Sequence, residues 1–156
     1  MKRGVNEVNT FVVDTSVLIE YIVERAPYRK RAERLLDMAS TGEVELYLNP
    51  VTLSETLYIA SRIYEASGIR DPNGEAMNYL NWIRKRVRLS EIHEETAIRA
   101  GELKKELRIA LADCYVIATS KELGVAPLFA RPEREMKPIL KRMRELGVKF
   151  LEEITL

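Results

Sequence analysis

Apolar and polar positions along the chain follow two alternating periods, which predicts strands and helices in turn. Short apolar runs typical of buried strands lie at 11–13, 44–48, 87–90, 125–130 and 148–151. Segments with helical spacing of apolar residues lie at 16–21, 28–39, 50–63, 75–86, 94–107, 109–123 and 133–146. Strands that alternate with helices predict an α/β fold, here a three-layer α/β/α sandwich with a central, mainly parallel sheet of four to five strands.

One carboxylate follows directly after the first apolar run. Asp14 ends the strand predicted at 11–13, and helical spacing begins at Ser16. An acid in such a turn lies at the carboxyl edge of a parallel sheet, where open α/β folds bind their ligands. An aspartate before a helix is also a common N-cap, which accepts hydrogen bonds from free backbone N–H groups. Asp14 alone therefore leaves a ligand and a cap as alternatives.

Two further acids lie near the starts of predicted helices. Glu55 falls in what we expect to be the first turn of its helix, where a glutamate commonly interacts with the helix dipole. Asp113 lies near the start of the apolar helix at 109–123, and a buried acid is usually paired with a cation or bound to a metal. An ion pair with Arg108 or Lys104 is the alternative to a metal at Asp113.

The three acid-bearing stretches, taken in order, resemble the motifs of the PIN-domain ribonucleases. They read Val-Val-Asp-Thr-Ser-Val-Leu at 12–18, Leu-Ser-Glu-Thr-Leu at 53–57 and Leu-Ala-Asp-Cys-Tyr-Val-Ile-Ala at 111–118. The resemblance covers nearly the whole chain, and it implies a PIN-like fold and divalent-metal-dependent cleavage of RNA. Many small, free-standing prokaryotic members are VapC-type toxins, so the resemblance also implies an antitoxin protein as a partner.

One part of the family's pattern is missing. PIN domains usually carry a fourth acid just after the fourth strand, whereas Arg131 and Pro132 follow the strand predicted at 125–130. Glu133 and Glu135 are candidates for a longer carboxylate ligand from the next turn. Both would equally suit the N-terminus of the helix that we expect Pro132 to open.

The resemblance implies that Asp14, Glu55 and Asp113 are catalytic and bind Mg²⁺ or Mn²⁺, hard cations that prefer oxygen ligands. Without a cation, three such carboxylates would repel one another and raise one another's pKa. We hypothesise that Asp14 and Asp113 bind the ion directly, and that Glu55 binds it directly or through water. The hydroxyls that would orient these carboxylates are those of Thr15, Ser16 and Thr119.

Composition narrows the class of protein. With 156 residues, of which 46% are hydrophobic and 31% charged, the chain is typical of a soluble globular protein. No repeat or long linker divides it, so we expect residues 1–156 to form a single PIN-like domain. The net charge is only +1, so contact with RNA needs a local basic patch. The densest basic run, either a solvated surface or an RNA-binding site, consists of Arg84, Lys85, Arg86 and Arg88.

Other catalytic machinery is missing from the sequence. No dinucleotide-binding or phosphate-binding glycine motif is present. His93 is the only histidine, which disfavours a Ser-His-Asp triad and a histidine-rich metal site. The single cysteine, Cys114, excludes an intramolecular disulfide and suits a reducing compartment. Because no apolar stretch reaches the length of about 18 residues that a membrane span needs, we expect a cytoplasmic protein without a membrane partner.

These observations predict a metal-dependent endoribonuclease that hydrolyses RNA phosphodiester bonds, either as the toxin of a toxin–antitoxin pair or as an RNA-processing nuclease. The alternative is a catalytically silent PIN-like module that binds RNA or another protein, and the missing fourth aspartate is its support. We also expect a homodimer, because PIN-domain proteins are often two-fold dimers. The residues that a single buried stripe would leave exposed, and that would form its interface, are Tyr28, Leu35, Tyr58 and Ile59.

Overall fold

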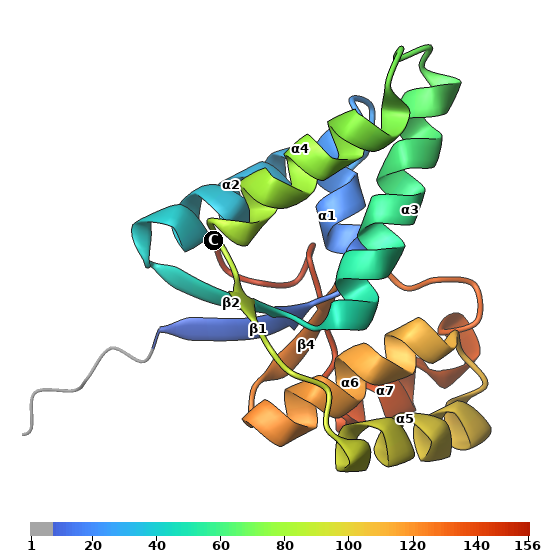
Figure 1. The fold of residues 1–156 in the computed structure, drawn as a ribbon. Coiled ribbons are helices and arrows are strands. Elements are labelled where there is room, and N and C mark those ends of the chain that lie inside the picture. Colours follow the sequence, from blue (N-terminus) through green and yellow to red (C-terminus); the bar gives the residue numbers. More distant parts are fainter. Residues whose placement is uncertain (1–7) are drawn as a thin grey trace, which may run out of the picture.

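A parallel β-sheet forms the centre of the protein in the computed structural model, which describes residues 8–156 (Figure 1). Within this range the strand order is β3-β2-β1-β4-β5, and every pairing is parallel. The strands are β1 (Asn9–Val13), β2 (Val44–Leu48), β3 (Arg88–Leu89), β4 (Ala126–Phe129) and β5 (Lys149–Phe150). This sheet confirms the expected α/β class.

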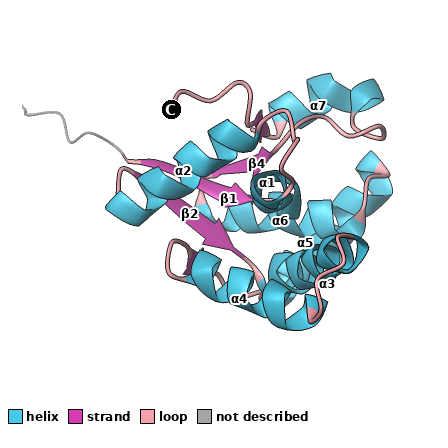
Figure 2. Ribbon diagram, turned by 90° about the horizontal axis from the view of Figure 1, so that it is seen from above, coloured by secondary structure: helices cyan, strands magenta, loops and turns pink. Residues whose placement is uncertain are grey.

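Helices cover both faces of the sheet and complete three layers (Figures 1 and 2). One face carries α1 (Thr15–Ile22), α2 (Arg29–Thr41), α3 (Pro50–Ala66) and α4 (Pro72–Arg84). The other carries α5 (Glu94–Leu107), α6 (Leu111–Leu123) and α7 (Leu140–Glu145), the last preceded by a short 3-10 helix at Lys137–Ile139. None of the helices in residues 8–156 combines the length and the apolar character that crossing a membrane requires.

Alternation along β1 explains why the sheet is buried on both faces. Phe11 and Val13 belong to the apolar cluster under α1 to α4, whereas Val12, between them, belongs to the cluster under α5 to α7. Successive side chains of a strand point to opposite faces, so the part of a central parallel strand that is covered on both faces, here Phe11 to Val13, is apolar at every position. The carboxyl end of β1 is therefore held by packing from both sides.

The helix predicted over 133–146 is wrong in its first half. Residues 131–136 form an irregular turn, and a regular α-helix begins only at Leu140. Pro138 is the reason, because proline has no backbone N–H to bond to the preceding turn and its ring clashes there. Glu133 consequently lies in a turn beyond β4 and not at a helix N-terminus.

The residues expected to form a dimer surface are mostly not on the surface. Leu35, on α2, is fully buried in the core, and Tyr28 and Ile59 are half-buried. Only Tyr58, on α3, is largely exposed, with 62% of its surface accessible. The four-residue apolar interface is therefore wrong as a description of the surface, and the homodimer stays a prediction.

The start of α3 is fixed by a buried amide. Asn49 is the N-cap of α3: the backbone N–H of Thr52 donates to its Oδ1 at 2.9 Å. Its Nδ2 donates to the Thr119 hydroxyl of α6 at 3.1 Å, and both side chains are fully buried. One side chain thus joins the helices on opposite faces of the sheet.

We expect Asn49→Ala to lower the free energy of unfolding by about 2 to 3 kcal/mol, because it removes a helix cap and leaves buried groups unpaired. The matched control is Asp71→Ala, at the exposed N-cap of α4, where Asp71 Oδ1 accepts from the backbone N–H of Gly74. That change should cost only about 0.5 to 1 kcal/mol. Urea unfolding measures both, and equal losses would show that the bond to Thr119 adds nothing.

Candidate metal centre

Asp14 directly follows β1, the strand at which the order of strands in the sheet reverses. From β1, the order continues to β2 and β3 on one side and to β4 and β5 on the other. Such a switch point leaves a crevice at the carboxyl ends of the strands, where open α/β folds bind ligands. The backbone N–H of Asp14 donates to Leu128 O of β4 at 2.8 Å, which fixes the residue at this crevice.

The Asp14 side chain is an N-cap with one oxygen to spare. The backbone N–H of Ser16 donates to Asp14 Oδ2 at 2.9 Å, so the cap interpretation is confirmed. The other oxygen, Oδ1, is buried and has no hydrogen-bond partner among the described residues. Capping therefore leaves half of the carboxylate available to a ligand.

Asp113 lies in the first turn of α6 and is only 4% exposed. The expected alternative, an ion pair with Arg108 or Lys104, is wrong: within residues 8–156 neither side chain pairs with it, and the Lys104 ammonium donates to Ile109 O at 2.6 Å. Asp113 Oδ2 is buried without a hydrogen-bond partner. Asp113 is thus a second buried carboxylate that the protein itself does not compensate.

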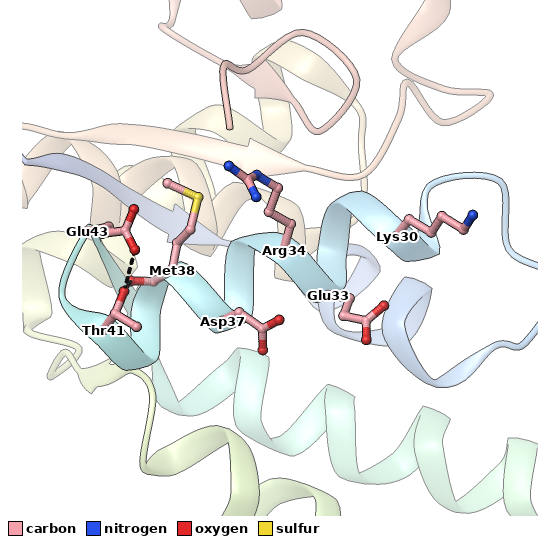
Figure 3. A pocket seen from close by; sticks show the side chains of 7 residues that line it. All are labelled: Lys30, Glu33, Arg34, Asp37, Met38, Thr41 and Glu43. Atoms are coloured by element: carbon pink, nitrogen blue, oxygen red, sulfur yellow. Dashed lines mark hydrogen bonds between the residues drawn. The ribbon is translucent and has the colours of Figure 1, made fainter.

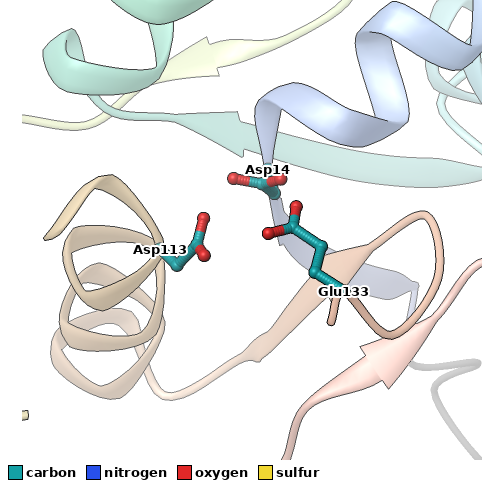
Figure 4. Close-up of side chains that lie close together, drawn as sticks. All are labelled: Asp14, Asp113 and Glu133. Atoms are coloured by element: carbon teal, nitrogen blue, oxygen red, sulfur yellow. The ribbon is translucent and has the colours of Figure 1, made fainter. Parts of the chain in front are cut away.

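Glu133 joins these two aspartates. Carboxylate oxygens of Asp14, Asp113 and Glu133 all lie within 4.8 Å of one another. Figure 4 shows the three side chains converging from the end of β1, from α6 and from the turn that follows β4. Glu135, the other candidate for the missing fourth acid, is exposed and does not belong to this group.

Glu55 lies on the wall of the same cavity. It is the sixth residue of α3, so the prediction that it belongs to the first turn is wrong. The cavity has a volume of about 190 Å³. Its lining consists of Asp14, Thr15, Ser16, Ile19, Glu55, Ile59, Ala110, Asp113 and Glu133. Glu55 therefore faces the cluster without joining its closest group.

The hydroxyl groups join the segments that carry the acids. Ser16 Oγ accepts from the backbone N–H of Ala130 at 3.0 Å, which connects α1 to the end of β4. Thr15 Oγ1 is buried and lies 3.4 Å from the Thr56 hydroxyl of α3, which donates to it. Thr119 contacts Asn49 and does not line the cavity. Ser16 is thus the hydroxyl that connects the Asp14 and Glu133 segments directly.

Burial makes these carboxyl groups hard to ionise. Desolvation is the largest cause that raises the pKa of Asp14 above its ordinary value, and Glu55 and Glu133 add repulsion. Desolvation likewise raises the pKa of Asp113, followed by repulsion from Asp14 and Glu133. Desolvation also raises the pKa of Glu133, followed by repulsion from Glu135 and Glu55. Positive charge among the carboxylates would reverse these shifts.

The donor set fits a hard divalent cation. Mg²⁺ and Mn²⁺ prefer carboxylate oxygens, and two buried oxygens here lack any other partner. Within residues 8–156 the cluster contains no histidine or cysteine, the ligands that favour zinc. The residues present therefore match the cation that the sequence predicted.

Most of the predicted basic run lines a different hollow from the acids. Lys85, Arg86 and Arg88 line a hollow beside Val44, at the amino end of β2. Arg86 stacks on the Trp82 ring at 3.5 Å, and Arg88 lies 3.2 Å from Glu45. RNA contact through Arg84, Lys85, Arg86 and Arg88 stays a prediction, because two of these cations already have partners and none of the four lines the cavity at Asp14.

Another hollow, of about 450 Å³, follows the outer surface of α2 (Figure 3). Its lining mixes cations and anions, among them Lys30, Glu33, Arg34 and Asp37. In Figure 3 these side chains spread along the helix and do not converge on a point. This surface has the character of a solvated helix face.

A doubly wound parallel sheet with buried acids gathered at its switch point defines the class of this protein: an α/β protein with a cluster of buried carboxylates. The family model described as PIN domain matches residues 11–134. The chain therefore belongs to the PIN domain family, which confirms the resemblance seen in the sequence. No curated protein sequence matches it.

Solved structures with the same fold cover almost the whole chain. VapBC2 from Rickettsia felis, bound to a DNA fragment from their promoter, matches with a TM-score of 0.65 at 14% identity, over 90% of this chain and 98% of the other. A toxin–antitoxin complex from Klebsiella pneumoniae matches with a TM-score of 0.61 at 17% identity, over 92% and 99%. VapC20 from Mycobacterium tuberculosis, described as a sarcin-ricin loop cleaving toxin, matches with a TM-score of 0.58 at 18% identity, over 76% and 87%. At such identities the likeness establishes the fold.

The raised pKa values predict that the metal-free protein loses stability as the pH rises. The pKa is about 7 for Asp14 and about 9 for Asp113, both above the ordinary value of 3.8 that applies to the unfolded chain. Between pH 3.8 and about 9 the folded state binds more protons than the unfolded state. The free energy of unfolding in EDTA therefore falls as the pH rises. Urea unfolding from about pH 5 to about pH 8 measures this slope.

Asp113→Asn is the matched variant, because it removes one of the buried charges and should flatten the slope while leaving the metal-free fold at least as stable at the higher pH. Mn²⁺ should raise the stability of the parent protein far more than that of the variant. A parent stability that increased with pH in EDTA would contradict the assignment of uncompensated buried acids.

Proposed function

We propose that this protein is a divalent-metal-dependent endoribonuclease that hydrolyses RNA phosphodiester bonds, with Mg²⁺ or Mn²⁺ as its cofactor. One observation carries the proposal: in a PIN domain, three carboxylates lie within 4.8 Å of one another at the switch point of the sheet. Two of them keep a buried oxygen without any hydrogen-bond partner in residues 8–156. A buried charge of this kind needs a cation.

The acids have separate roles in this proposal. Asp14 and Asp113 bind the ion through their unpartnered oxygens, and Glu133 replaces the aspartate that the sequence lacks after β4. Glu55, on the opposite wall of the cavity, holds the ion directly or through water. When bound, such a cation activates a water molecule for attack and neutralises charge on the scissile phosphate.

The surrounding residues hold these carboxylates in place. Ser16 fixes Asp14 through its backbone N–H and the end of β4 through its hydroxyl. Thr15 ties the start of α1 to α3 through Thr56. Because Asp14 and Asp113 lie on well-packed elements, two of the proposed ligands are positioned before any ion arrives, which lowers the cost of binding.

We further propose that the protein is the toxin of a toxin–antitoxin pair, with RNA as substrate and an antitoxin protein as partner. The support is the fold shared with VapBC2 of Rickettsia felis and with VapC20, described as a sarcin-ricin loop cleaving toxin. The activity belongs in the cytoplasm, where the buried thiol of Cys114 stays reduced. An RNA-processing nuclease is the second candidate, and co-purification with the product of a small neighbouring gene distinguishes the two.

We also propose that the protein is a homodimer, and the support for this is that PIN-domain proteins are often two-fold dimers. A two-fold contact has to use exposed surface. Of the four residues expected at the interface, Tyr58 on α3 is the one that is largely exposed. Light scattering at micromolar concentration should give twice the mass of 18.0 kDa. A monomer mass would remove this part of the proposal and leave the nuclease unaffected.

Single-stranded RNA should be cleaved in the presence of Mg²⁺ or Mn²⁺, and EDTA should stop the reaction. The double variant Asp14→Asn, Asp113→Asn should lose activity by about a thousandfold or more, because both unpartnered oxygens lose their charge. A catalytically silent module would show neither cleavage nor an increase in melting temperature with Mn²⁺. Cleavage that survives the double substitution would place the chemistry elsewhere in the chain.

Glu133 and Glu135 provide a matched pair of variants, because they lie two positions apart in the same turn and each can be changed to glutamine. Glu133→Gln should weaken Mn²⁺ binding by about tenfold or more, as expected when one carboxylate ligand is lost. Glu135→Gln should change it by less than about twofold, because an exposed charge acts only through screened repulsion. Calorimetric titration with Mn²⁺ measures both, and equal effects would mean that Glu133 is not a ligand.

A further inference from the structure

The backbone of Arg108 adopts a conformation that suits glycine. Its φ of 58° and ψ of 28° are left-handed, and it is the one residue other than glycine with a positive φ in residues 8–156. The remaining positive values belong to Gly42, Gly68, Gly124 and Gly147. A side chain at such a position brings Cβ too close to the backbone, whereas glycine adopts it without cost.

The conformation itself is required by the fold. Arg108 is the C-cap of α5, where its backbone N–H donates to Lys104 O at 3.1 Å and ends the helix. The next residue, Ile109, is buried in the core cluster between α5 and α6. The chain therefore has to turn at this residue, and a glycine would make the turn more easily than an arginine does.

The side chain of Arg108 makes no polar contact that would stabilise the fold in residues 8–156. It is exposed, and within residues 8–156 it forms neither an ion pair nor a side-chain hydrogen bond. Other cations nearby are used: Lys104 donates to Ile109 O, and Arg142 lies 2.7 Å from Glu106. Folding thus explains the left-handed turn and leaves the arginine at that turn unexplained.

Arg108 is close in sequence to the acidic cavity. Ala110, two residues further on, lines the cavity together with Asp113. Two residues span at most about 7 Å of chain, so the backbone of the arginine lies within that distance of a lining residue. A guanidinium presents its donors in a fork that matches the oxygens of a phosphate. RNA would need such a cation here, because buried acids repel it and the net charge is only +1.

We propose that Arg108 binds a phosphate of the RNA strand next to the scissile one, and that this contact is why an arginine occupies a glycine-like position. The inference rests on the proposed function, because it assumes that RNA reaches the acidic cavity. It makes Arg108 a substrate-binding residue and assigns it no part in bond cleavage.

The test uses the Asp14→Asn, Asp113→Asn protein as parent, since this form should bind RNA without cleaving it and without metal. Fluorescence anisotropy with a labelled, mixed-sequence single-stranded RNA gives the dissociation constant over a series of salt concentrations. Adding Arg108→Gly should weaken binding about fivefold and reduce the slope of log K against log salt by about 0.7, the value for one lost phosphate contact on a single strand. Its melting temperature should equal or exceed that of the parent, because the strained turn is relieved.

Two further variants distinguish a specific phosphate contact at Arg108 from a general effect of positive charge on RNA binding. Arg108→Lys keeps the charge but lacks the forked donors, so it should retain only part of the affinity. Lys105→Ala removes an exposed charge one turn earlier on α5 and should change little. Equal losses for Arg108→Gly and Lys105→Ala, or none for Arg108→Gly, would overturn the inference while leaving the nuclease intact. A large fall in melting temperature would show a structural role instead. If the parent binds no RNA at all, the proposed function fails with it.

Discussion

The main physical constraint on this structure is the burial of uncompensated carboxylates at the carboxyl end of β1. Asp14 and Asp113 are 2% and 4% exposed, and each keeps an oxygen without a partner in residues 8–156. Charge in such a place is costly, and the pKa of both groups rises as a result. A fold selected for stability alone would replace these side chains with apolar or hydrogen-bonded ones, so stability does not explain why they are acids.

Segments far apart in the sequence have to meet for this arrangement to exist. The end of β1 is set by apolar packing on both faces, and α6 brings Asp113 to it through the buried Val116 and Ile117. The Ser16 hydroxyl holds the end of β4, and the Asn49 amide holds the start of α3 against α6. Because these contacts join whole elements, the positions of Asp14 and Asp113 are a property of the fold, whereas Glu133 comes from the turn that follows β4.

Much of this could be predicted from the sequence, for a physical reason. Buried strands and amphipathic helices follow directly from where apolar side chains must go, and Asp14 and Asp113 were conspicuous as acids in apolar surroundings. The position of Glu133 could not be predicted, since it depends on Pro138 preventing a helix and on the path of the turn after β4. Leu35 was misplaced for a related reason: helical spacing indicates which residues share a face, but not which second layer covers that face.

Two features that local rules would reject lie close together in the sequence, at positions 108 and 113. Asp113 violates the rule that buried charges are compensated, and Arg108, five positions earlier, violates the preference for glycine in a left-handed turn. Elsewhere in residues 8–156 the turns with positive φ have glycine, and within that range the unpartnered buried carboxylate oxygens belong to Asp14 and Asp113. Natural sequences tend to break local rules where function requires it. A cation between the carboxylates and a phosphate at the arginine would remove both conflicts, and one RNA strand passing over this cavity would meet them together.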